Sequence, residues 1–179
     1  MFQTLSAIGT KLNENNIIWG VGASILMYQH GLLSNPHDIN LIVDINDIEK
    51  ADKILKRMGE RKTYYKDTNY STKYFYEYVI NNIDVDVMAG LAINHNSGIF
   101  EYNFDCNSVS EFIEINDVSI PFTSLEDWYV IYQLIPGRES KVKMIEDYLL
   151  QSRLHNPDLL KRLLQENLPT KALDNKIIY

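Results

Sequence analysis

WGVGASILMYQHGLLSNPHDINLIV, residues 19–43, is the stretch that decides the fold of this chain. A short apolar segment at residues 17–20 leads into Gly22, and glycine suits a tight turn from a strand into a helix. A helix-length segment at 23–33 follows, and then a run at 38–44 in which apolar and polar residues alternate. The stretch therefore predicts strand, turn, helix and strand in succession, as in an α/β fold.

Polar side chains occur two residues apart on two predicted strands. Asp38 and Asn40 lie on the first of them. Asp84 and Asp86 lie on another, predicted over residues 83–88. Residues two apart on a strand face the same way, so up to three carboxylates would converge if these strands are neighbours. Such a cluster needs a hard cation, and Mg²⁺ prefers oxygen ligands. The alternative for either pair is a strand cap or a solvated edge strand.

The glycine turn, the helix and the following strand together resemble the nucleotidyltransferase fold of the DNA polymerase beta superfamily. In that family a Gly-Gly or Gly-Ser turn precedes a helix and a strand that reads Asp, apolar, Asp or Glu. Here Gly22-Ala23-Ser24 and Asp38-Ile39-Asn40 stand at these places. The third family carboxylate matches Asp86 better than Asp84, because Asp-Val-Met-Ala-Gly is similar to the strand ending of small members.

The resemblance implies a role for each of these residues. It assigns catalysis to three acids: Asp38, Asp86 and Asp84. It assigns nucleotide binding to four residues at and beside the turn: Gly22, Ala23, Ser24 and Asn40. The metal ion would be held by Asp38 and Asp86. Asn40 departs from the family pattern, because a neutral amide supplies no charge to a shared metal site.

A second resemblance lies downstream, at PFTSLED (residues 121–127) and GRESK (residues 137–141). Both are similar to the helical part of small bacterial nucleotidyltransferase-like proteins of the antibiotic-modifying and abortive-infection types. Val142 stands where that pattern has an Asp. Arg138 and Lys141 are able to reach a phosphate or, alternatively, to pair with nearby glutamates.

Helices and strands are predicted throughout the rest of the chain. Apolar spacing predicts helices over 2–15, 47–58, 124–135 and 138–151, with another after residue 156. Aromatic and β-branched residues predict strands over 63–65, 72–80, 91–95, 99–104, 109–115 and 117–121. The expected fold is α/β (α+β), with a mixed sheet backed by helices. We expect a core at residues 1–122 and a C-terminal helical part at 123–179, packed together as one compact unit.

Composition narrows the classes of partner. A hydrophobic content of 45% with 23% charged residues is typical of a globular chain. The net charge of −7 argues against a broad nucleic-acid surface. A single cysteine, Cys106, excludes an intramolecular disulfide. No apolar run reaches the ~20 residues of a membrane span, so a cytoplasmic protein is expected. The 12 tyrosines are typical of core and sheet faces. The alternative for four of them is a position in a cleft: Tyr64, Tyr65, Tyr74 and Tyr76.

The resemblance implies transfer of a nucleoside monophosphate from a nucleoside triphosphate to a hydroxyl, with Mg²⁺ or Mn²⁺ as cofactor. The acceptor would be a small, antibiotic-like molecule or a macromolecule. The alternative is a catalytically degenerate relative that binds a ligand or a protein partner, or serves as a toxin–antitoxin component. Asn40, Ala23 and Val142 favour this alternative. A third alternative is an interaction module whose helices at 124–165 form a homodimer face.

Overall fold

The computed structural model describes residues 1–63, 68–152 and 156–173. Seven strands form the main sheet: β1 (Trp19–Val21), β2 (Ile39–Val43), β3 (Glu60–Arg61), β4 (Tyr74–Ile80), β5 (Ile83–Ala89), β8 (Glu111–Ile115) and β9 (Val118–Phe122). A separate hairpin consists of β6 (Leu91–His95) and β7 (Gly98–Tyr102). The helices are α1 (Phe2–Glu14), α2 (Ala23–Gln29), α3 (Ile48–Leu55), α4 (Leu125–Leu134), α5 (Glu139–Ser152), α6 (Pro157–Leu163) and α7 (Thr170–Leu173), with a 3-10 turn at η1 (Cys106–Ser108).

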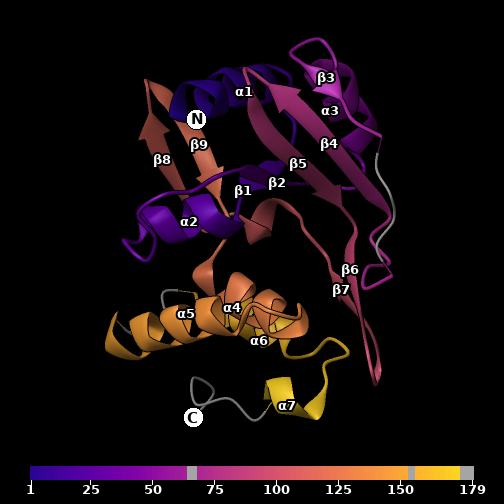
Figure 1. Ribbon diagram of the computed structural model, residues 1–179, viewed down its shortest axis with the longest axis vertical. Helices are drawn as coiled ribbons and strands as arrows, with labels where there is room; N and C mark the ends of the chain where they lie inside the picture. The colour runs from indigo at the N-terminus through magenta and orange to yellow at the C-terminus, as the bar shows by residue number, and fades with distance from the viewer. Residues whose placement is uncertain (64–67, 153–155, 174–179) are drawn as a thin grey trace.

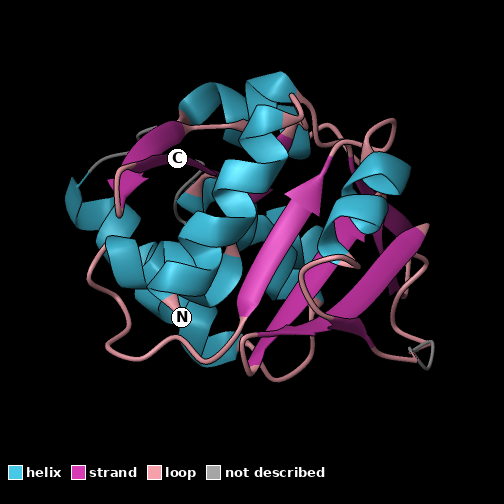
Figure 2. Ribbon diagram, turned by 90° about the horizontal axis from the view of Figure 1, so that it is seen from above, coloured by secondary structure: helices cyan, strands magenta, loops and turns pink. Residues whose placement is uncertain are grey.

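The main sheet has the strand order β3-β4-β5-β2-β1-β9-β8. It is mixed, because β2 runs parallel to β5 and antiparallel to β1. Figure 1 shows α1 and α3 on one side of the sheet, and α2 with the C-terminal helices on the other. Figure 2 looks from above onto the same layers, in which helices cover the twisted strands. The predicted α/β fold with a mixed sheet backed by helices is confirmed.

Local sequence explains two of the hairpins in this sheet. Asn81 and Asn82 join β4 to β5 with φ angles of +51° and +60°. Asn116 and Asp117 join β8 to β9 with φ angles of +50° and +62°. Two successive residues with positive φ match the twist of paired strands, and Asn and Asp adopt this conformation more readily than most residues. These turns therefore fix the register of both hairpins.

Helix α4 is the most deeply buried helix of the C-terminal part. Nine of its ten residues are buried, including the polar pair Glu126 and Asp127. A helix that is buried all round lies inside a domain and not on its surface. The chain passes from sheet to helices between the end of β9 and the start of α4. The sequence predicts a domain boundary at 122/123, at the same place. The division into two parts stays a prediction.

Several element boundaries differ from their predictions. The helix predicted over 23–33 ends at Gln29, and Gly31 follows with a φ of +71° in the turn after it. The strand predicted over 63–65 falls mainly outside the described residues, and β3 lies just before it. Within the described part of the chain, no helix has both the length and the apolar character to cross a membrane.

Candidate functional site

The sheet register places three polar side chains in one row. Asn40 on β2 is paired with Asp86 on the parallel strand β5. Glu77 on the antiparallel strand β4 is paired with the same Asp86. Residues paired across strands lie on the same face of a sheet, and neighbouring strands are ~4.8 Å apart. The row therefore runs Asn40, Asp86, Glu77, and Asp38 lies two residues before Asn40 along the same face.

This row forms one wall of a cleft of about 280 Å³. The polar residues on that wall are Asp38, Asn40, Glu77 and Asp86. Apolar and aromatic side chains also line the cleft, among them Phe75, Met88, Trp128, Ile131 and Tyr132. Arg138 and Lys141, at the start of α5, complete the lining. Carboxylates thus come from the sheet and cations from the helices, so the cleft suits a ligand that carries phosphates and binds a cation.

The glycine turn holds the start of α2 against α4. A Cβ atom on Gly22 would lie 2.3 Å from the Trp128 ring, so only glycine fits there without a shift. The Trp128 indole N–H donates to Thr123 Oγ1 at 2.9 Å, which fixes the ring. The backbone N–H of Gly22 donates to the Asn40 carbonyl at 3.1 Å. The amides of the first helix residues, Ala23 and Ser24, are the ones that point beyond the helix end.

Ser24 positions Asp38 by a direct hydrogen bond. The Ser24 hydroxyl donates to Asp38 Oδ1 at 3.0 Å. Both residues line the cleft. A hydroxyl that donates to a carboxylate orients it, and such charge-assisted bonds are stronger than neutral ones. The structure therefore brings the predicted phosphate-binding turn and the predicted metal-binding acid into contact.

The charges in the cleft perturb one another. Burial, together with the nearby Asp38, Glu77 and Asp84 carboxylates, raises the pKa of Asp86 to about 7. On the helical side, burial lowers the pKa of Lys141, and the neighbouring Arg138 adds to this effect. Like charges that must share a partly buried space are costly unless an opposite charge joins them. The carboxylate wall is therefore suited to a cation.

Asp84 lies at the rim and not in the cleft. Its side chain is 63% exposed, and Lys62 Nζ lies 2.5 Å from Asp84 Oδ1. The two residues border a smaller hollow of about 190 Å³ that also touches Asp38, Glu77 and Asp86. Asp84 is thus engaged by a lysine, whereas Asp86 faces the main cleft.

Glu77 is not among the residues that the sequence predicted for the site, whereas Tyr74 and Tyr76 do not line the cleft, in line with the sheet-face positions that were favoured for the tyrosines. The signal for Glu77 was a lone acid inside YFYEYVI, the sequence of β4. The alternation of side chains along β4 places Phe75 in the cleft with Glu77. Tyr74 and Tyr76 point to the other face, where Arg61 lies 3.8 Å from the Tyr76 ring centroid. These two tyrosines are therefore sheet-face residues; Tyr64 and Tyr65 lie outside the described residues.

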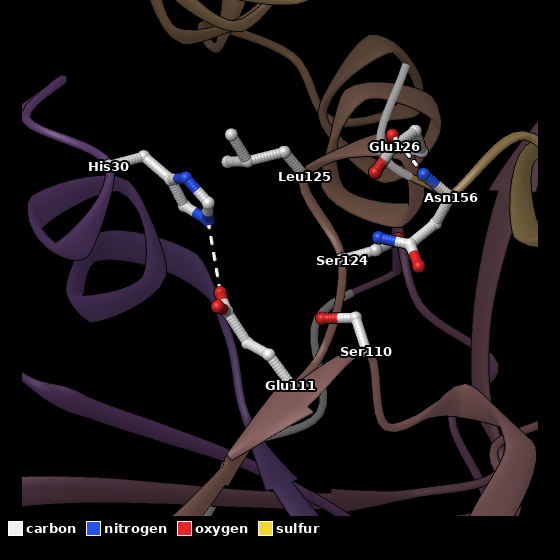
Figure 3. Close-up of a pocket in the computed structure, with 7 residues that line it drawn as sticks. All are labelled: His30, Ser110, Glu111, Ser124, Leu125, Glu126 and Asn156. Carbon is white, nitrogen blue, oxygen red and sulfur yellow. Dashed lines mark hydrogen bonds and ion pairs between the residues drawn. The ribbon is translucent and has the colours of Figure 1, made fainter. Parts of the chain in front are cut away.

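A second cavity, of about 250 Å³, is lined by His30 at the C-terminal end of α2 and by residues of β8 and the start of α4 (Figure 3). It contains a serine, a histidine and a glutamate: Ser110, His30 and Glu111. His30 Nε2 lies 3.3 Å from Glu111 Oε1, and its Nδ1 lies 3.2 Å from the Tyr148 hydroxyl. Ser110 Oγ donates to the Thr123 carbonyl at 2.8 Å. One ring nitrogen is thus directed at Glu111 and the other at Tyr148, and the Ser110 hydroxyl donates to a backbone carbonyl, so the serine and the histidine do not form a nucleophile–base pair.

The donor set of the main cleft fits Mg²⁺ as an open site. Among residues 1–63, 68–152 and 156–173, no group of three or more His, Cys, Asp or Glu side chains is arranged to hold a metal ion by itself. Mg²⁺ does not need such a cage, because it commonly binds one or two carboxylates and takes its other ligands from substrate phosphates and water. Asp38 and Asp86 offer two carboxylates, and Asn40 offers an amide oxygen.

The fold is similar to that of several solved structures of nucleotidyltransferases. A provisionally assigned nucleotidyltransferase of Thermotoga maritima, TM1012, is 25% identical, with a TM-score of 0.64 over 83% of this chain and 92% of its own. ANT(2")-Ia in complex with adenylyl-2"-tobramycin is 13% identical, with a TM-score of 0.57 over 90% of this chain and 93% of its own. The lincosamide antibiotic adenylyltransferase LnuA, bound to lincomycin, is 14% identical, with a TM-score of 0.54 over 80% of this chain and 95% of its own. No protein-family model and no curated protein sequence matches the chain.

The chain therefore has the nucleotidyltransferase fold, in a form shared with enzymes that adenylylate antibiotics. The resemblance in fold that its turn, helix and strand suggested is confirmed. Nucleotidyl transfer is the reaction to which the names of these neighbours refer.

Proposed function

We propose that this protein transfers a nucleoside monophosphate from a nucleoside triphosphate to a hydroxyl group, with Mg²⁺ or Mn²⁺ bound in the main cleft. The observation that carries this proposal is the cleft itself. It has Asp38 and Asp86 on the sheet wall and Arg138 and Lys141 on the helical side, in a nucleotidyltransferase fold. Phosphoryl-type transfer depends mainly on positioning and on neutralising charge, and these residues provide for both.

Each group of residues would have its own task. Asp38, held by Ser24, and Asp86 would hold the metal ion, which supplies positive charge to the reacting phosphate. The backbone at Ala23 and Ser24 would contact the triphosphate from one side. Arg138 and Lys141 would contact it from the other. One of the carboxylates in the cleft would accept the proton of the acceptor hydroxyl.

A small-molecule acceptor has room next to the cleft. A groove of about 640 Å³ runs between the β6–β7 hairpin and α5, and Tyr132 and Ile135 line both it and the cleft. Glu139 and Glu146 give the groove acidic groups. We propose a small acceptor with several hydroxyl groups, in line with the antibiotics named for two of the structural neighbours.

The second candidate function is binding without transfer. Asn40 favours it, because a neutral amide replaces the second carboxylate on the strand where the family pattern has two. A degenerate member would bind a nucleotide or a protein partner and leave the phosphate bonds intact. Substitution of Asn40 by Asp separates the two candidates: a degenerate site would gain metal dependence from the restored acid.

Thermal unfolding with ATP, GTP, CTP and UTP, each with and without Mg²⁺ or Mn²⁺, tests the proposal. A ligand present at ~100 times its dissociation constant stabilises a protein by about 2.7 kcal/mol. For a chain of this length we expect a shift in Tm of roughly 5–10 °C. Asp38→Ala should abolish the metal-dependent shift, whereas Asp158→Ala, whose side chain is 94% exposed on α6, should retain it. A wild-type protein that responds to no nucleotide would contradict the proposal.

Transfer itself requires a second readout. We expect release of pyrophosphate from the preferred triphosphate when hydroxylated small molecules are added, and labelled nucleotide on the acceptor. Nucleotide binding without any transfer across such a screen would favour the binding-only candidate.

A further inference from the structure

Glu77 is placed as a partner of the two family acids, although no family pattern in the sequence points to it. It is paired in register with Asp86 on the next strand. Asn40 is paired with Asp86 from the opposite side. The central acid of the row thus has a neutral neighbour on β2 and an acidic neighbour on β4.

The alternation of β4 directs Glu77 toward the cleft. Its neighbour Tyr78 is fully buried on the other face, where the hydroxyl donates to Asp52 Oδ1 at 2.6 Å. Glu77 lines both the main cleft and the small hollow beside it. A tyrosine anchored on one face fixes the strand, so the glutamate next to it is held on the cleft face.

With Glu77, the carboxylate wall has as many acids as it would have with an Asp at residue 40 and no acid at residue 77. Asp38, Asp86 and Glu77 contribute three carboxylates, and Asn40 contributes none. An Asp at residue 40 would also give three acids with Asp38 and Asp86, but on two strands instead of three. The nearest described lysine on this wall, Lys62, bonds to Asp84 at 2.5 Å. The backbone N–H of Lys62 donates to the Glu77 carbonyl at 2.8 Å, but among the contacts of the described residues the Glu77 carboxylate forms no hydrogen bond or ion pair with this lysine.

We infer that Glu77 replaces the acid missing at Asn40 and serves as an anionic ligand for the divalent cation. This inference rests on the proposed function. The affinity of an oxygen site for a divalent cation depends on the number of charged ligands. A carboxylate at residue 77 therefore keeps the number of charged ligands that the amide at residue 40 would otherwise reduce. Asn40 then does not indicate a degenerate site, because the acid that the family has at residue 40 is present at residue 77 instead.

Titration of the full-length chain with Mn²⁺ tests the inference without measuring activity. Calorimetry and the electron paramagnetic resonance signal of free Mn²⁺ give the affinity and the number of ions bound. Glu77→Gln should weaken binding at least about tenfold. Glu114→Gln, which removes an exposed acid from the edge strand β8, is the matched control and should bind as the wild type does.

The double variant Glu77→Gln/Asn40→Asp provides the decisive comparison. If the two positions fulfil one role, the Asp at residue 40 should restore most of the affinity lost with Glu77. Restoration also excludes misfolding of Glu77→Gln as the cause of its weak binding. A Glu77→Gln variant that binds Mn²⁺ as tightly as the wild type would overturn the inference, and so would a double variant that stays as weak as the single one.

The outcome for Glu77 is separable from that for the proposed function. If Asp86→Asn abolishes metal-dependent ATP binding and Glu77→Gln leaves it intact, the proposed function stands and the role of Glu77 falls. If neither the wild type nor the Asn40→Asp variant binds Mn²⁺ or ATP, both the proposed function and the role of Glu77 are contradicted.

Discussion

Ala23 adopts a backbone conformation that is unfavourable for its residue type. Its φ is +54°, in the left-handed region, at the first residue of α2. For a residue with a Cβ atom this conformation costs about 1–2 kcal/mol, and glycine avoids that cost. Strain of this kind tends to persist at functional sites, because the surrounding structure holds it in place. Here the surroundings are Gly22 on one side and the bond between Ser24 and Asp38 on the other.

Ala23→Gly should therefore stabilise the protein. We expect the free energy of unfolding to rise by about 0.5–1 kcal/mol, since relief of strain is partly offset by the greater freedom of glycine in the unfolded chain. Urea unfolding measures this. Ala7→Gly, at an exposed place in α1, is the control and should lose about 1 kcal/mol. Equal losses in both variants would contradict the strained conformation.

Asp127 is a buried acid with one oxygen that is poorly satisfied. Its side chain is fully buried, and Oδ2 accepts a hydrogen bond from the Tyr102 hydroxyl at 2.6 Å. Its Oδ1 accepts none from the described residues. Burial raises the pKa of Asp127 to about 6, compared with about 3.9 for a free Asp. The folded protein therefore takes up a proton at a higher pH than the unfolded chain does.

This shift predicts that acid stabilises the fold through Asp127. Between about pH 4 and pH 6 the folded state binds more protons, so the free energy of unfolding falls as pH rises through this window, by about 2–3 kcal/mol. Asp127→Asn keeps an acceptor for Tyr102 but cannot titrate. We expect urea unfolding at pH 4.5 and pH 7.5 to show a smaller loss in the variant than in the wild type. The same pH dependence in both proteins would refute the assignment.

At the scale of elements, the start of α4 fixes the boundary between sheet and helices. The Ser124 hydroxyl accepts a hydrogen bond from the Asp127 backbone N–H at 3.0 Å, and Ser124 is 1% exposed. A capping oxygen satisfies one of the N–H groups that a helix start leaves without a partner. Loss of this oxygen would leave the backbone N–H of Asp127 without its hydrogen-bond partner.

Ser124→Ala should accordingly lower the free energy of unfolding by about 1–2 kcal/mol. The measurement is urea unfolding followed by far-ultraviolet circular dichroism. Ser97→Ala, at an exposed turn between β6 and β7, should change it by less than about 0.5 kcal/mol. If Ser124→Ala were as stable as the control, the cap would not contribute to the fold.

At the scale of the whole molecule, the cleft exists only because sheet and helices meet. Its carboxylates come from β4, β5 and the start of β2, and its cations come from the beginning of α5. Arg138 is exposed, and Lys141 is partly covered by Tyr132, whose ring centroid lies 5.0 Å from its Nζ. A nucleotide with its metal ion would join the two walls by opposite charges.

Lys141→Ala should separate nucleotide binding from metal binding. We expect the dissociation constant for ATP to rise about tenfold in the presence of Mn²⁺, since a charge-assisted contact to phosphate is lost. Mn²⁺ binding without nucleotide should not weaken. Lys143→Ala is the control on the same helix, because Lys143 pairs with Glu146 and Asp147 and does not line the cleft. An unchanged affinity for ATP in Lys141→Ala would remove this residue from the site.

Much of this architecture could be predicted from local patterns. Apolar spacing, the turn residues and the cap at Ser124 lie close together in the sequence, and they correctly indicated the order of helices and strands. The strand-turn-helix-strand unit at residues 19–43 was enough to suggest the nucleotidyltransferase fold. The helix predicted to residue 33 ended early, because Gly31 adopts a positive φ that breaks the helix.

The sequence by itself thus determined the elements, the fold and the presence of acids two residues apart on two strands. Only the tertiary structure decided which acids meet. The parallel pairing of β2 with β5 puts Asp86 beside Asn40, and the antiparallel pairing of β4 puts Glu77 beside Asp86. The side-chain period of a strand shows which residues share a face, but strand order and register arise from contacts between segments far apart in the chain. For the same reason, local sequence could not predict that Lys141 lies opposite these acids.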